Sequence, residues 1–210
     1  TDAACGALLK ALAESGQADN TVVIFSADNG SEAYAYARDK TFGHWSSAPF
    51  RGVKQDLYEG GHHVPLLVRW PGKVKPGTVS DALVSQIDLM ATFADLLQVE
   101  LPEGEAQDSL SILPILDGSG KGPRTALVHS TWKRVGFGVR QGEWLLINEK
   151  TGYSRPPKEG WSERHGYPED TNDEAELYNL KTDIGQRTDL AELYPERVAE
   201  MKALLKVVAG

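Results

Sequence analysis

Apolar residues recur four positions apart at the start of the chain and then gather in short unbroken runs. The first pattern predicts an amphipathic helix over residues 2–15, which Gly16 ends in a left-handed conformation. Next come residues Thr21–Ala27, where four consecutive large apolar residues predict a strand buried on both faces, as in the interior of a parallel sheet. A long polar loop, residues 28–59, separates this strand from a second one predicted at Val64–Trp70. This order of elements is typical of one winding of an α/β fold.

A helix and then a change of composition follow these strands. Ser85-Gln86-Ile87-Asp88 is a capping-box sequence, so we expect a helix that carries the apolar residues of 89–97. Residues 101–123 are rich in Pro, Gly, Asp and Ser, which indicates a domain seam. We therefore divide the chain into domains 1–122 and 123–210.

The second of these domains has the alternating pattern of an antiparallel sheet followed by a helix. Pro195 suits the first turn of a helix with one apolar stripe, and Gln141-Gly142-Glu143 suits a tight turn between strands. The short strands predicted before that helix are 126–132, 135–140 and 144–148.

Composition excludes several classes of protein. The 210 residues include 22 Lys+Arg and 30 Asp+Glu, a net charge of −8, and no basic cluster, which argues against nucleic acid as the main partner. No apolar run approaches the ~18–20 residues that a membrane-spanning helix needs. The single cysteine, Cys5, excludes an internal disulfide and a multi-cysteine metal site.

Candidate chemistry begins directly after the first predicted strand. Asp28 and Asn29 supply two oxygen ligands of the kind that Ca²⁺ or Mg²⁺ prefers, at the sheet edge where α/β proteins bind ligands. Gly30 lets the backbone turn sharply after them. Asp-Asn-Gly is also a common turn sequence, and these three residues alone favour a plain turn.

Further along, Lys54 is a cation on a long stem that can reach an anion held at such a metal, although a solvated lysine before a turn is the simpler interpretation. His44, on the same long loop, is a candidate for substrate binding, with packing against Trp45 as the alternative. His62 and His63 are adjacent, so on an extended segment they would point to opposite faces and would not easily bind one ion together.

Taken in order, these motifs closely resemble the type I sulfatases, which are arylsulfatase-like members of the alkaline phosphatase superfamily. The resemblance rests on TVVIFSADNG, FRGVK and YEGGHHVPLLVRWPG, and it is supported by VSQIDL, SILPILDG and ELYNL. It implies an α/β fold: the C-terminal part of a doubly wound sheet over 1–122, then a small α+β subdomain with an antiparallel sheet and a terminal helix over 123–210.

For the site, the resemblance implies that Asp28 and Asn29 bind one Ca²⁺ ion and that Lys54 contacts the sulfate group and stabilises its developing charge. The family often has E-G-G-x-R-V-P, and here His63 stands in place of the Arg. The formylglycine nucleophile, two further aspartates, a histidine and another lysine have no counterpart in this sequence. We therefore expect them upstream, in a missing N-terminal part of the same protein, and we expect this chain alone to be inactive.

The resemblance also implies a sulfuric ester hydrolase that acts on a sulfated small molecule or sulfated carbohydrate, in the periplasm or outside the cell. Two alternatives stay open at this point. One is a phosphatase or phosphodiesterase of the same superfamily, and the other is a non-catalytic remnant that binds an anion or a carbohydrate.

Overall fold

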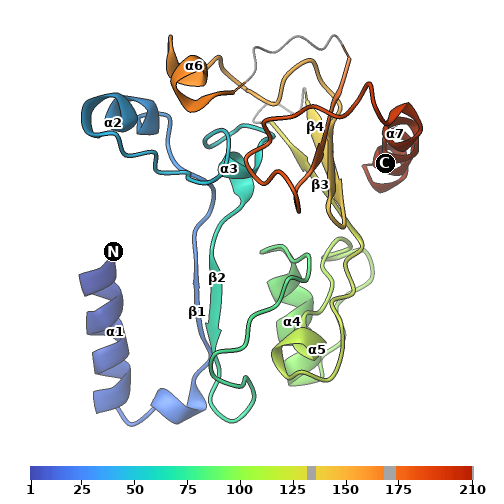
Figure 1. Ribbon diagram of the computed structural model, residues 1–210. Helices are drawn as coiled ribbons and strands as arrows, with labels where there is room; N and C mark the ends of the chain where they lie inside the picture. The colour runs from blue at the N-terminus through green and yellow to red at the C-terminus, as the bar shows by residue number, and fades with distance from the viewer. Residues whose placement is uncertain (132–135, 168–173, 210) are drawn as a thin grey trace. The chain divides into compact units, whose positions relative to one another are not determined.

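A computed structural model describes residues 1–131, 136–167 and 174–209 of the chain (Figure 1). The chain forms two compact units: the first comprises Thr1–Ser26 and Pro65–Arg124, and the second comprises Ala27–Val64 and Thr125–Gly210. No helix in the described part is long and apolar enough to cross a membrane. Trp132 and Val135, at the ends of two predicted strands, lie outside the described residues. The division into domains near residue 122 stays a prediction.

The first unit begins with the predicted amphipathic helix. Helix α1 ends one residue earlier than expected, and Gly16 follows its C-cap with a φ of 72°, which confirms the predicted left-handed turn. The described elements of this unit are α1 (Asp2–Glu14), the 3-10 helix η1 (Ala18–Asn20), β1 (Val23–Ser26), β2 (Leu66–Arg69), α4 (Asp88–Leu97) and α5 (Leu113–Leu116).

The two strands of the first unit correct one expectation. We predicted a strand buried on both faces, as in a parallel sheet, but β1 pairs with β2 in antiparallel register, with Phe25 opposite Leu67. Both of these side chains are exposed, at 39% and 58%. The physical reason is that β1 and β2 form a two-stranded antiparallel sheet among the described residues, and such a sheet can face water on one side.

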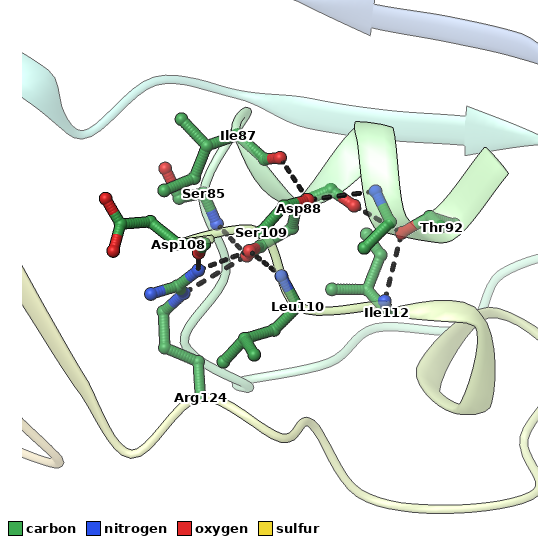
Figure 2. Close-up of polar contacts among 10 residues, drawn as sticks. Ser85, Ile87, Asp88, Thr92, Asp108, Ser109, Leu110, Ile112 and Arg124 are labelled. Atoms are coloured by element: carbon green, nitrogen blue, oxygen red, sulfur yellow. Dashed lines mark hydrogen bonds and ion pairs between the residues drawn. The ribbon is translucent and has the colours of Figure 1, made fainter. Parts of the chain in front are cut away.

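A buried carboxylate ties α4 to the segment that follows it (Figure 2). Asp88 is fully buried and accepts hydrogen bonds from the backbone N–H of Ser85 (2.8 Å) and of Leu110 (3.0 Å). The guanidinium of Arg124 forms an ion pair with the same carboxylate. The bond to Ser85 is one half of the predicted capping box. Asp88 therefore joins the start of the helix to residues far along the chain.

The second unit is built on a four-stranded antiparallel sheet. Its strands follow the order β3-β4-β5-β6, and each pairs with the next. The sequence predicted the first three strands and the last helix but not the fourth strand. The described elements of this unit are α2 (Ala35–Phe42), α3 (Glu59–His62), β3 (Ala126–Ser130), β4 (Phe137–Gln141), β5 (Trp144–Ile147), α6 (Trp161–His165), β6 (Glu176–Asn179) and α7 (Pro195–Val208).

One face of this sheet packs against the terminal helix. Val139, Leu146 and Leu177 are fully buried and form one apolar cluster with Met201 and Leu205 of α7. These strand residues alternate with residues of the opposite face, as the two-residue period of a strand requires.

The opposite face carries the segment 27–64. Leu145, Ile147 and Tyr178 form a second cluster, to which Leu57 and Tyr58 belong. The long loop that we expected over residues 28–59 thus packs on the sheet and contains helix α2, whose alanine, tyrosine and charged residues gave no clear helical stripe. The segment that holds the candidate chemistry is therefore fixed by the core of the second unit.

Candidate functional site

The residues Asp28 and Asn29 lie on a loop that is tied to the double glycine. Asp28 is exposed, whereas Asn29 is partly buried and donates through Nδ2 to the carbonyl oxygen of Gly30 (3.0 Å). The N–H of Gly30 in turn donates to the carbonyl oxygen of Gly61 (2.9 Å). Because the amide nitrogen of Asn29 is used in this way, its carbonyl oxygen is left as the atom that can bind a cation.

Glycines allow three backbone segments to pack together at this site. A Cβ on Gly30 would lie 1.8 Å from the carbonyl oxygen of Gly60, and a Cβ on Gly61 would lie 2.2 Å from that of Asp56. A Cβ on Gly60 would lie 2.3 Å from the carbonyl oxygen of Gly52. No side chain fits between these segments, so the glycines bring the loop after β1 next to the loop that carries Lys54.

This packing predicts a contrast between two glycines. Gly60→Ala is expected to lower the free energy of unfolding by about 1–3 kcal/mol, because the new methyl group would clash with the carbonyl oxygens of Gly52 and Arg51. Gly6→Ala is the control: it lies in α1 with no atom within 4 Å of a Cβ, and a gain of up to about 1 kcal/mol is expected. Urea unfolding of both variants measures the difference. Equal effects would contradict the close packing.

Lys54 lies beside the Asp28–Asn29 loop and is held there by two hydrogen bonds. Its N–H donates to the carbonyl oxygen of Ser31 (2.8 Å), and its Nζ donates to Oε1 of Glu32 (2.6 Å). That hydrogen bond and the charge of Glu32, with a smaller contribution from Asp28, raise the pKa of Lys54 above its ordinary value. The side chain is about one-third exposed and is a cation at neutral pH.

The turn that carries Lys54 is fixed by a buried carboxylate. Asp56 accepts hydrogen bonds from the backbone N–H of Val53 and of Ser154, both at 2.8 Å. Burial raises the pKa of Asp56 to about 6, although these bonds favour its charged form. Asp56 thereby connects the Lys54 turn to a segment of the C-terminal half of the chain.

His63, which stands in place of the family's usual arginine, makes a close contact with a buried glutamate. Its Nδ1 lies 2.5 Å from Oε2 of Glu59, one helical turn earlier, and Arg140 lies 3.4 Å from the same oxygen. Burial raises the pKa of Glu59, but the hydrogen bond from His63 and the charges of His62 and Arg140 outweigh it, so this pKa lies below its ordinary value. The residue at this position therefore contacts a carboxylate that Arg140 also approaches.

A cavity of about 330 Å³ joins two of the predicted site residues. Asn29 and Lys54 line it together with Gln55, Asp56, Gly61, His62, His129 and Ser130. His44 does not line this cavity and is exposed after the end of α2. Sequence reasoning missed Glu32, Gln55, Asp56 and His129, because nothing in the order of residues shows that β3 and the turn after Lys54 line one cavity.

The donor set fits one part of a calcium site. Asp28 and Asn29 offer two hard oxygens, whereas Ca²⁺ takes about 6–8. Among the described residues no group of three or more His, Cys, Asp or Glu side chains is placed to hold a metal ion. These two residues can therefore contribute to a calcium site, but they cannot complete one.

Comparisons with known proteins agree on one family. The model of the Sulfatase family matches residues 1–99, and a model described as N-sulphoglucosamine sulphohydrolase, C-terminal, matches residues 53–149. An N-acetylgalactosamine-6-O-sulfatase of Bacteroides thetaiotaomicron is 35% identical over 90% of this chain and 36% of its own length. Human arylsulfatase A is 33% identical over 97% of this chain and 40% of its own. The chain thus spans less than half of these curated relatives.

Solved structures give the same result. A structure from work on the metabolism of multiple glycosaminoglycans by Bacteroides thetaiotaomicron matches 97% of this chain and 42% of that chain, with a TM-score of 0.79 and 34% identity. A second structure, in complex with its substrate D-glucosamine-2-N,6-O-disulfate, matches 97% of this chain and 37% of that chain, with a TM-score of 0.69 and 25% identity.

Proposed function

This chain belongs to the sulfatase family, and from this premise we propose that the protein hydrolyses sulfuric esters, with the chain supplying part of the active site. The observation that supports the proposal most directly is the shared cavity. Asn29, a candidate metal ligand, and Lys54, a fixed cation, line the same cavity of about 330 Å³. A divalent cation and an ammonium on either side of one tetrahedral anion stabilise the charge that develops on it.

In this proposal each residue has a separate task. Asp28 and Asn29 contribute two oxygen ligands to one Ca²⁺ ion, which when bound supplies positive charge beside the sulfate group. Lys54 binds a sulfate oxygen directly, and Glu32 and Ser31 hold it in place for that contact. His44, which is exposed, is in this proposal a further residue that binds the substrate.

The remaining groups belong, in this proposal, to an N-terminal part of the same protein. They are the formylglycine nucleophile and the other calcium ligands. Residues 1–122 are then the end of the catalytic domain, and 123–210 form a small C-terminal subdomain. The substrate is a sulfated small molecule or, given the sugars in the names of the relatives, a sulfated carbohydrate. We expect the protein in the periplasm or outside the cell.

The proposal is tested by comparing the release of sulfate from two sulfate esters with the release of phosphate from one phosphate ester. The full-length protein, supplied with Ca²⁺, is incubated with N-acetylgalactosamine 6-sulfate, with 4-nitrophenyl sulfate and with 4-nitrophenyl phosphate. Sulfate release is expected to exceed phosphate release and to fall when a chelator removes Ca²⁺. Phosphate release as the main activity, or no sulfate release from either ester, would contradict the proposal.

A further inference from the structure

Gln55 has a backbone conformation that residues with a side chain rarely adopt. Its φ is 81°, in the left-handed region that favours glycine. An L-residue held in that region is strained, and such strain is retained where the surrounding structure or a function requires it. Glycine at this position would avoid the cost, so the Gln55 side chain needs an explanation.

The position of Gln55 in the cavity supplies an explanation for its side chain. It follows Lys54 directly, it is partly buried, and it lines the cavity that Asn29 and Lys54 also line. In the part of the chain that the structure describes, its side chain has no hydrogen-bond or ionic partner. A primary amide has two donors and an acceptor, so it can bind both hydroxyl and amide groups of a ligand.

The rest of the cavity wall indicates which part of a ligand would meet this amide. Lys54 carries a positive charge in the wall, whereas burial lowers the pKa of His62 and of His129, that of His129 to about 3, and so favours the neutral form of both rings. Ser130 adds a hydroxyl. Asp56 adds a carboxylate to the wall, but both of its oxygens already accept backbone hydrogen bonds. The groups left for a ligand are one cation and several neutral polar groups, which suit a neutral polar group attached to an anion.

We propose that Gln55 is a specificity-determining residue, which binds a hydroxyl or acetamido group of a sulfated sugar whose sulfate lies at Lys54. This inference rests on the proposed function and adds to it the residue that recognises the alcohol part of the ester. The left-handed backbone at residue 55 is, in this view, the cost of placing an amide next to the sulfate-binding lysine.

The test separates the effect of the Gln55 side chain on binding from the effect of its strained backbone on stability. Binding of N-acetylgalactosamine 6-sulfate, of galactose 6-sulfate and of inorganic sulfate is measured by calorimetry on the full-length protein, with thermal unfolding in parallel. Gln55→Ala and Gln55→Gly are each expected to lower the affinity for the sugar sulfates about five- to tenfold relative to inorganic sulfate. Only Gln55→Gly is expected to raise the unfolding temperature, because it alone relieves the positive φ. A loss confined to the acetamido sugar identifies that group as the partner, and a loss for both identifies a hydroxyl.

Gln98→Gly is the matched control, since Gln98 is also a glutamine with positive φ (56°) but is exposed at the end of α4. It is expected to raise the unfolding temperature and to leave the ratio of affinities unchanged. The inference is overturned if both Gln55 variants bind sugar sulfates and inorganic sulfate with the wild-type ratio, or if wild type prefers neither sugar sulfate to inorganic sulfate. Sugar binding without sulfate release would contradict the proposed hydrolysis and still decide the role of Gln55.

Discussion

Replacing Lys54 by alanine is expected to lower kcat/KM for sulfate esters in the full-length protein by a factor of about 10²–10³, the usual cost of removing one preorganised group that stabilises developing charge. Lys54 is held by hydrogen bonds to Glu32 and to Ser31, so its position is set before a substrate arrives. Its ammonium lines the same cavity as Asn29. Steady-state kinetics with 4-nitrophenyl sulfate give the number directly.

The matched control for this variant is Lys181→Ala. Lys181 also donates to a carboxylate, that of Glu143 at 2.7 Å, and this interaction likewise raises its pKa. It does not line the cavity, so a change of less than about twofold is expected, as for most surface ion pairs. Equal losses in the two variants, or a Lys54→Ala enzyme with wild-type kcat/KM, would remove Lys54 from the site.

The sequence pointed to the segments that form this site because backbone segments that pack closely need glycine, and glycines are visible in the sequence. The segments that the structure brings together are marked by glycines: Gly30 after the candidate ligands, Gly52 before Lys54, and Gly60 and Gly61 ahead of β2. A run of glycines between polar residues is visible in the sequence alone. The contacts that these glycines make with one another are not, since they join segments that are far apart along the chain.

Other features depended on tertiary packing that no local pattern shows. The apolar run at β1 predicted burial on both faces, yet Phe25 is exposed, and β2 is the one strand that pairs with β1 among the described residues. Helix α2 lay within an expected loop, because only Ala35, Tyr36 and Asp39 of its residues are buried. The roles of Gln55 and His129 at the cavity follow from the packing of β3 beside the Lys54 turn, which the sequence does not reveal.

The second unit also contains a buried cation that the sequence did not single out. Arg51 is fully buried, with its guanidinium 4.0 Å from the ring centre of Tyr58 and 4.8 Å from that of Tyr153. It donates to the hydroxyl groups of Tyr153 (2.9 Å) and Tyr178 (3.2 Å). Glu176, also buried, accepts hydrogen bonds from the hydroxyls of Tyr58 (3.0 Å) and Tyr178 (3.1 Å). Tyrosines therefore link a buried positive charge to a buried negative one.

Replacing Arg51 by methionine is therefore expected to lower the free energy of unfolding by about 3–5 kcal/mol, because it removes a buried positive charge that Tyr178 links to the buried carboxylate of Glu176. The double variant Arg51→Met/Glu176→Gln removes both charges and is expected to recover at least about 1 kcal/mol of this loss. Arg38→Met is the control, since Arg38 is exposed and lies 5.8 Å from the ring of Tyr34, and a change within about 0.5 kcal/mol is expected. Urea unfolding of the full-length protein, followed by tryptophan fluorescence, measures all three.

A loss below about 1 kcal/mol for Arg51→Met would show that the guanidinium does not support the segment that carries Lys54. A loss of the expected size would mean that a buried charge, three residues before the proposed sulfate-binding lysine, stabilises the segment that holds it.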